Sequence, residues 1–365
     1  MLSFLPPGLR VICLAAALGS AWTAKAGDET PVTYREQEVV FGKTQTGVEL
    51  AGTLTVPRGP GPFPAVVLVA GSGPMNRDEE VFGHRPFAVL ADHLARRGLV
   101  VLRYDKRGVG KSTGDFAQST TLDFSGDAIS AWDFLAAKPE VDAKRVGAIG
   151  HSEGGMIVPT LAANRPETAF IVMLAGVGMS GGDLELLQSS LLKKAEGMDP
   201  EELALEEETT RRWIAMVKAG DTNEQIEEAL RPRIEAAAAK SGSDAKRAVA
   251  RLHSPWWRFI LTHSAIPDLE KVHCPVMALN GSKDLQVPPR ENLVPIAQAL
   301  ARAGNTDFVI REMPGLNHLF QHAVTGSESE YAGSKEAISP QVVAMVGDWI
   351  VDRTGLPASD KTPEN

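Results

Sequence analysis

One serine lies in a sequence setting suited to nucleophilic catalysis. Residues 150–155 read Gly-His-Ser-Glu-Gly-Gly, a G-x-S-x-G motif that follows the apolar run 146–150 and precedes a predicted helix. In a nucleophile elbow, the serine occupies a sharp strand-to-helix turn, and side chains two positions away on either side would collide with the neighbouring strand and helix. The motif alone arises often by chance, but this context makes Ser152 the candidate nucleophile.

A serine hydroxyl needs an imidazole to take its proton and a carboxylate to hold that imidazole in the right tautomer. In the expected chain order, the acid follows the serine and the histidine comes last. Asp284 follows the apolar run 275–280, and His318 follows the run 307–310. Open α/β sheets bind ligands at the carboxyl ends of their strands. Asp284 is therefore the predicted acid and His318 the predicted base.

Both assignments have alternatives. Asp284 could brace a turn, as many loop aspartates do. Of the eight histidines, His318 and His322 lie beyond the last predicted strand, and His322 is expected on the following helix. This favours His318. We expect His151 to point away from the serine hydroxyl, and a structural role is the simpler interpretation for both His151 and Cys274.

Acyl transfer also requires donors for the tetrahedral oxyanion. The backbone N–H of Glu153, directly after the serine, is one candidate. The other should come from the loop 70–74, Ala-Gly-Ser-Gly-Pro, with Ser72 N–H preferred to Gly73 N–H. A plain tight turn is the alternative for this loop. The Glu153 side chain could recognise a substrate amine, or it could be solvated or ion-paired.

Residues 104–112, Tyr-Asp-Lys-Arg-Gly-Val-Gly-Lys-Ser, look at first like a phosphate-binding loop. The spacing is incomplete, because Asp105 stands where the first glycine of that motif belongs. The stretch instead predicts a turn in which Asp105 and Arg107 pair to brace the oxyanion loop.

The elements around these residues alternate in a way typical of an α/β fold. An antiparallel pair at 38–41 and 48–56 opens the pattern, and continuous apolar runs then alternate with helical stretches. Runs without polar alternation indicate strands covered on both faces. A right-handed, doubly wound parallel sheet follows. Its predicted strands are 65–70, 99–105, 146–150, 170–175, 275–280 and 307–310, and its helices are 87–97, 123–137, one opening near 154, 290–303 and 342–351.

The alternation is interrupted once, between 181 and 267, by helical stretches rich in Glu, Lys and Ala. We interpret this block as a helical lid inserted into the catalytic unit. The predicted plan is a core in two parts, 27–180 and 268–355, with the lid between them and a flexible tail at 356–365.

The first 26 residues resemble a secretory signal peptide. Arg10 precedes the apolar run 11–18, and Ala-Lys-Ala at 24–26 offers a cleavage site. The run is shorter than the roughly 20 residues of a membrane span. We expect an exported protein, periplasmic or secreted, without a stable membrane span; a lipoprotein anchored at Cys13 is the less favoured alternative. Removal of the leader leaves Cys274 without a disulfide partner.

The composition narrows the possible partners. The chain has 365 residues, 43% hydrophobic and 23% charged, with a formal net charge of −9. A negative field argues against nucleic acid and anionic membranes as partners. A small-molecule substrate is the expected partner, and the sequence indicates no oligomeric state.

The sequence resembles bacterial α/β-hydrolase-fold esterases with a helical lid, related to the serine aminopeptidase and dienelactone hydrolase groups. The resemblance covers nearly all of the chain after the leader and lies in the segments 70–78, 103–108, 150–155, 254–258, 279–288 and 314–320. It implies an α/β-hydrolase fold, hydrolysis of short-acyl carboxylic esters, and Ser152, Asp284 and His318 as the triad. It implies no metal and no cofactor.

Within the lid, the resemblance is limited to Trp256 and Trp257, which we expect to form an apolar wall for the substrate unless they are plain lid core. Two other functions are possible. An exopeptidase would need an acidic pocket for a free amino terminus, for which the glutamate clusters at 201–202 and 206–208 are available. A non-catalytic binding protein on a hydrolase scaffold is the second, which the complete set of catalytic elements disfavours.

Overall fold

A computed structural model describes residues 33–43, 47–240 and 242–356. The predicted signal peptide, residues 1–26, lies outside the described residues, as do residues 357–365 of the predicted tail. The described strands form one mixed sheet in the order β1-β2-β4-β3-β5-β6-β7-β8. Their bounds are β1 Tyr34–Phe41, β2 Leu50–Pro57, β3 Phe63–Val69, β4 Val100–Tyr104, β5 Val141–His151, β6 Ile171–Leu174, β7 Val276–Gly281 and β8 Phe308–Met313.

The sheet has an antiparallel edge and a parallel body. Strand β2 pairs antiparallel with both β1 and β4, as the sequence predicted for the entry pair. All pairs from β4 to β8 are parallel. The predicted α/β architecture with a mostly parallel sheet is confirmed, and the parallel strands bring their carboxyl ends to one edge.

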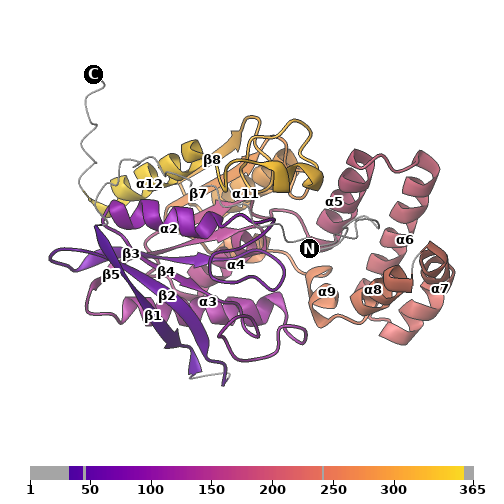
Figure 1. Cartoon of the computed structure of the whole chain (residues 1–365), viewed down its shortest axis with the longest axis horizontal. Helices are drawn as coiled ribbons and strands as arrows, with labels where there is room; N and C mark the ends of the chain where they lie inside the picture. The colour runs from indigo at the N-terminus through magenta and orange to yellow at the C-terminus, as the bar shows by residue number, and fades with distance from the viewer. Residues whose placement is uncertain (1–32, 44–46, 241, 357–365) are drawn as a thin grey trace, which may run out of the picture.

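Helices cover both faces of the sheet (Figure 1). The alternation of side chains along β3 shows how each face is built, because Val66 and Leu68 pack in the cluster of α2 and α12, whereas Val67 and Val69 pack in that of α3, α4 and α11. Successive strand residues point to opposite faces, so a strand buried on both sides must be apolar throughout. The bounds are α2 Pro86–Arg96, α3 Thr121–Ala136, α4 Glu153–Asn164, α11 Pro289–Arg302 and α12 Pro340–Thr354.

The segment between β6 and β7 carries helices that extend beyond one end of the sheet (Figure 1). Ser180 and Ser254 each accept a hydrogen bond at the start of a helix, the pattern expected of an N-cap. These helices are α5 Gly181–Ala195, α6 Pro200–Ala219, α7 Asn223–Lys240, α8 Gly242–Leu252 and α9 Pro255–Ile260, and α10 Ile266–Leu269 then packs against α4 and α11. In the described part of the chain, no helix is long and apolar enough to cross a membrane.

Two glycines allow the turn from β5 into α4. A Cβ atom on Gly150 would lie 2.0 Å from the carbonyl oxygen of Gly154, and one on Gly154 would lie 1.9 Å from the carbonyl oxygen of Val69. Backbone therefore contacts backbone on both sides of Ser152, which is the physical reason for the glycines predicted there.

Replacing Gly154 by alanine should disrupt this contact, because the obstacle is a main-chain oxygen that cannot rotate away. We expect Gly154→Ala to lower the free energy of unfolding by about 3 kcal/mol or more, measured by urea denaturation. Gly126→Ala is the matched control, since a Cβ there, within helix α3, meets no atom within 4 Å. It should raise stability by roughly 0.5–1 kcal/mol. Equal effects of the two substitutions would contradict the close approach.

Candidate active site

Ser152 lies at the turn between β5 and α4 in a strained backbone conformation. Its φ is +55° and its ψ is −115°, and its N–H donates to the carbonyl of Leu174 at 2.9 Å. A non-glycine residue in such a region costs on the order of 1–3 kcal/mol, so the surrounding contacts must enforce it. The strain and the tight packing of Gly150 and Gly154 together hold the serine at the carboxyl edge of the sheet.

The structure brings the predicted acid and base together. Asp284 follows β7 and His318 follows β8, and the His318 Nδ1 to Asp284 Oδ2 distance is 2.9 Å. The side chains are 5% and 0% exposed. Because an ionised carboxylate only accepts hydrogen bonds, Nδ1 is the protonated nitrogen, and Nε2 keeps the lone pair that a general base requires.

Backbone donors fix the Asp284 carboxylate. Its Oδ1 accepts from the N–H groups of Gln286 and Val287, each at 2.8 Å, which leaves Oδ2 for His318. The carboxylate is thereby oriented before any substrate arrives. The same side chain also braces the turn, which was the alternative role considered for Asp284.

The loop after β3 lies against the nucleophile. A Cβ on Gly71 would be 3.1 Å from the Cβ of Ser152, so the approach is as close as a glycine allows. Lys106 Nζ donates to the carbonyl of Gly71 at 2.8 Å. In a trans peptide the C=O and the next N–H point in opposite directions. The Ser72 N–H therefore points away from Lys106, as an oxyanion donor should, and Ser72 lines the same pocket as Ser152.

Lys106 also forms a buried ion pair with Glu153. The Nζ to Oε2 distance is 2.9 Å, and both side chains are less than 5% exposed. Thr121 Oγ1 and Trp256 Nε1 donate to the other carboxylate oxygen at 2.7 and 2.6 Å. Burial alone would raise the pKa of Glu153, but Lys106 and these hydrogen bonds hold it below its usual value. Of the two roles considered for this side chain, the structure supports the ion pair.

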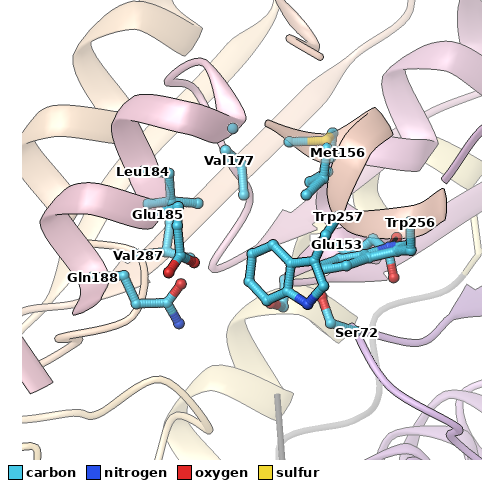
Figure 2. Close-up of a pocket in the computed structure, with 13 residues that line it drawn as sticks. Ser72, Glu153, Met156, Val177, Leu184, Glu185, Gln188, Trp256, Trp257 and Val287 are labelled. Atoms are coloured by element: carbon cyan, nitrogen blue, oxygen red, sulfur yellow. Dashed lines mark hydrogen bonds between the residues drawn. The ribbon is translucent and has the colours of Figure 1, made fainter. Parts of the chain in front are cut away.

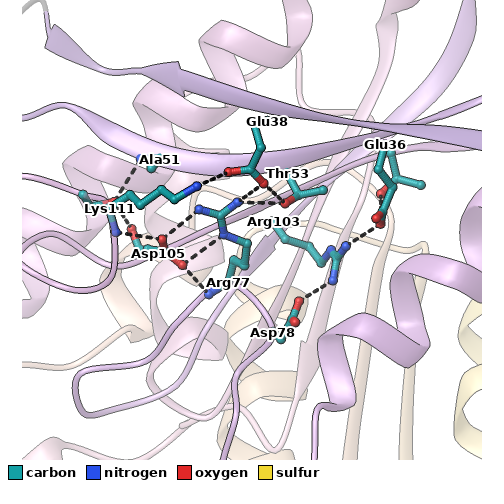
Figure 3. Close-up of polar contacts among 11 residues, drawn as sticks. Glu36, Glu38, Ala51, Thr53, Arg77, Asp78, Arg103, Asp105 and Lys111 are labelled. Atoms are coloured by element: carbon teal, nitrogen blue, oxygen red, sulfur yellow. Dashed lines mark hydrogen bonds and ion pairs between the residues drawn. The ribbon is translucent and has the colours of Figure 1, made fainter.

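The predicted pairing of Asp105 with Arg107 is wrong. Asp105 instead accepts from Arg77, with Nη2 to Oδ2 at 2.9 Å, within a polar network that reaches β1 and β2 (Figure 3). Arg107 turns to helix α3 and pairs with Asp127 at 2.7 Å. Lys106, between them in sequence, is the residue that donates to the loop predicted to supply the oxyanion donor. Its signal in the sequence was a charged residue directly after a buried strand.

A pocket enclosing about 440 Å³, part of it open to solvent, lies over Ser152. In Figure 2, the tryptophans of α9 lie across this space from the polar side chains of α5. The lining is mostly apolar and comes from both the sheet edge and the inserted helices. It consists of Ser72, Ser152, Glu153, Met156, Val177, Gly181, Leu184, Glu185, Gln188, Trp256, Trp257, Ile260 and Val287.

Trp256 and Trp257, the predicted substrate contacts, both line this pocket. Trp257 is held from behind by Arg251, whose guanidinium carbon lies 3.9 Å from the centroid of its ring. Arg251 also pairs with Glu185, a pocket residue that sequence reasoning missed. Helices α5, α8 and α9 are thereby joined around one wall.

Other candidates lie elsewhere. His322 is exposed, bonded to Glu336, and paired in an isolated bridge with Leu316 rather than placed on a helix, so that expectation is wrong. Burial raises the pKa of the Cys274 thiol to about 12, which fits an unreactive structural residue. Among the described residues, no group of three or more histidine, cysteine or acidic side chains is placed to bind a metal ion.

Two of the known proteins that the chain resembles are described as esterases. Esterase EstD of Thermotoga maritima is 37% identical over 145 residues, which are 40% of this chain and 33% of EstD. Esterase FrsA of Shigella boydii is 30% identical over 149 residues, again 40% of this chain and 33% of the relative. The chain thus matches about a third of the length of each of these two relatives.

Solved structures share the fold at low sequence identity. Est1E from Butyrivibrio proteoclasticus, described with bound ferulic acid, has a TM-score of 0.53 and 16% identity, covering 87% of this chain and 100% of Est1E. An esterase of Pyrococcus furiosus has a TM-score of 0.54 and 15% identity, covering 91% of this chain and 96% of that one. These likenesses agree with the α/β-hydrolase fold expected from the sequence.

A family model covers most of the chain, including Ser152 and Asp284. The model described as X-Pro dipeptidyl-peptidase (S15 family) matches residues 46–317 and ends one residue before His318. The chain therefore belongs to the X-Pro dipeptidyl-peptidase (S15) family and has the α/β-hydrolase fold.

Proposed function

We propose that this protein is a carboxylesterase that cleaves small, uncharged, short-acyl esters through a Ser152–His318–Asp284 triad. The observation that carries the proposal is the Asp284–His318 pair at 2.9 Å, whose His318 carbonyl lies 3.0 Å from Nε2 of His151, the residue directly before the strained Ser152 that lines a mostly apolar pocket. The esterase relatives support the same reaction class.

The proposed reaction has two steps. Ser152 Oγ attacks the ester carbonyl while His318 Nε2 takes its proton, and the N–H groups of Ser72 and Glu153 stabilise the oxyanion. His318 then protonates the departing alcohol as the carbon–oxygen bond breaks, which leaves an acyl-serine. Water, activated by His318, attacks the acyl-serine and releases the acid.

The charges around the pocket favour a neutral substrate. Its two described carboxylates, Glu153 and Glu185, are already paired with Lys106 and Arg251. A compensated carboxylate has little affinity left for a substrate cation, since binding would compete with an existing buried pair. The tryptophans and aliphatic side chains offer contact to an acyl or alcohol group.

An exopeptidase is the second candidate, favoured by the family match and by the position of Glu185 in the pocket. The glutamate clusters considered for amine recognition have other partners. Glu206 pairs with Lys193 and Arg233, and Glu207 pairs with Arg211. These contacts support the ester reading for this site.

Ser152→Ala should remove the nucleophile without disturbing the fold. We expect kcat on p-nitrophenyl acetate to fall by about 10⁴-fold or more, with an unchanged denaturation midpoint. Asp284→Asn should also cost about 10⁴-fold, because the amide would favour the wrong imidazole tautomer. A fluorophosphonate should add its mass to Ser152 and not to the alanine variant. A parent protein that neither hydrolyses the ester nor takes up the label would support a binding protein instead.

Lys106→Met tests the bracing of the oxyanion loop. Because the loss acts on the oxyanion donor rather than on substrate contacts, kcat should fall about 100-fold while KM changes little. The variant also leaves the Glu153 carboxylate buried without its partner, which destabilises the fold. Adding Glu153→Gln removes that charge, so the double variant should regain stability without regaining rate. Recovery of both would show that Lys106 has a structural role alone.

A substrate panel separates the two candidate functions. Against p-nitrophenyl esters of two to eight carbons and aminoacyl p-nitroanilides, we expect kcat/KM to be at least about 100-fold higher for the best ester. Glu185→Gln should leave the neutral esters within about threefold of the parent enzyme. A preference for aminoacyl anilides that Glu185→Gln abolishes would establish the exopeptidase.

A further inference from the structure

Glu79, in the loop between β3 and α2, is both buried and strained. It is 2% exposed, and its φ is +53°, a conformation that non-glycine residues avoid. Its neighbours hold the chain from the other side, because Arg77 pairs with Asp105 and Asp78 pairs with Arg103 (Figure 3). These two ion pairs anchor the residues directly before Glu79, whose carboxylate is buried.

The inward carboxylate joins two loops of the active site. Glu79 Oε1 accepts the N–H of Gly71 at 2.6 Å and lies 3.0 Å from His151 Nδ1. The other ring nitrogen of His151, Nε2, lies 3.0 Å from the carbonyl oxygen of His318. The oxyanion loop and the loop of the general base are therefore linked through two buried side chains.

The partners of His151 determine its protonation. A backbone carbonyl can only accept, so His151 Nε2 must carry a proton. Glu79 Oε1 also accepts from Gly71, and because a carboxyl group is a stronger acid than an imidazolium, the proton between Oε1 and Nδ1 lies on Nδ1, which makes Nδ1 a donor as well. With both ring nitrogens donating, His151 is an imidazolium, and it forms a buried ion pair with Glu79.

We propose that Glu79 and His151 are positioning residues that act as a carboxylate–imidazolium pair and set the geometry between the oxyanion donors and His318. The inference rests on the proposed function, because it assigns a task to groups next to the proposed catalytic residues. Neither side chain is proposed to contact the substrate or the reacting atoms.

The charged surroundings of His151 support the imidazolium. It faces Glu79 from the β3–α2 loop, Asp284 from the loop after β7 and His318 from the loop after β8. Burial alone would lower the pKa of His151, but Glu79 and the His318 carbonyl, with Asp284, raise it above its usual value.

The sign of the pH effect follows from this shift. A histidine whose folded pKa is raised stabilises the fold fully below its unfolded pKa of about 6.5, and this contribution disappears as pH rises through the folded value. A neutral ring has a single N–H, so His151 should lose one of its two hydrogen bonds, to Glu79 or to the His318 carbonyl, over the same range. Activity should therefore decline on the alkaline side together with stability.

The protonation state can be measured without any assay of activity. In protein labelled with ¹⁵N-histidine, one imidazole should keep protons on both ring nitrogens at pH 7.5, about one unit above the usual histidine pKa. This signal should be absent from His151→Gln and present in His93→Gln, the control, whose histidine lies on α2 with its pKa lowered by burial. A neutral His151 at pH 7 would overturn the proposal.

Kinetics tests the positioning role. With rates normalised to fluorophosphonate-reactive serine, Glu79→Gln and His151→Gln should each lower kcat about ten- to hundredfold and leave KM within about twofold. The double variant should lose no more than the worse single variant. In Glu79→Gln, the alkaline limb of the kcat profile should move to lower pH, whereas His93→Gln should keep the parent profile.

The outcomes distinguish this inference from the proposed function. A parent enzyme that neither hydrolyses esters nor reacts with the fluorophosphonate would refute the proposed function, whatever the ¹⁵N spectrum shows. An active parent whose Glu79→Gln and His151→Gln variants keep full kcat per reactive serine would refute the positioning role alone.

Discussion

The approach of backbone to backbone around Ser152 is the constraint on which the site depends. Strand β5, helix α4 and the end of β3 meet within the space that glycines leave, and no other residue type fits between them. Because the parallel strands end at the same edge, this one contact also determines where Asp284 and His318 must arrive from β7 and β8. The topology of the sheet and the chemistry of the site are consequences of the same packing.

Buried charges maintain the arrangement after the backbone has formed it. Lys106 with Glu153 and His151 with Glu79 lie on either side of the oxyanion loop, one bonded to the carbonyl of Gly71 and one to its N–H. Burying such pairs has a large desolvation cost, which their geometry must offset. The two pairs hold the backbone dipoles of a loop of small residues in place, so these dipoles need no rearrangement during the proposed reaction.

The sequence was sufficient for those parts that local rules govern. Apolar runs predicted the strands, and chain order placed Ser152, Asp284 and His318 at the ends of three of them. These local rules could not predict contacts between residues distant in sequence, such as Glu79 and His151, which are 72 positions apart. The error at Arg107 has the same origin, because neighbouring charges in a turn can leave it in different directions. Pocket walls such as Glu185 depend on how inserted helices pack, which periodicity does not specify.

The sheet and the inserted helices contribute different parts of the site, and this separation affects which substitutions the protein can accept during evolution. Helices α5 and α9 supply Glu185, Trp257 and much of the pocket wall, whereas Ser152, Asp284 and His318 lie at the edge of the sheet. Substitutions in these helices can therefore change which ligands bind, with little effect on Ser152, Asp284 and His318. Trp256 is where the two parts overlap, since its indole binds Glu153 beside the nucleophile. A substitution of Trp256 that changes substrate selectivity would therefore also change the reaction rate.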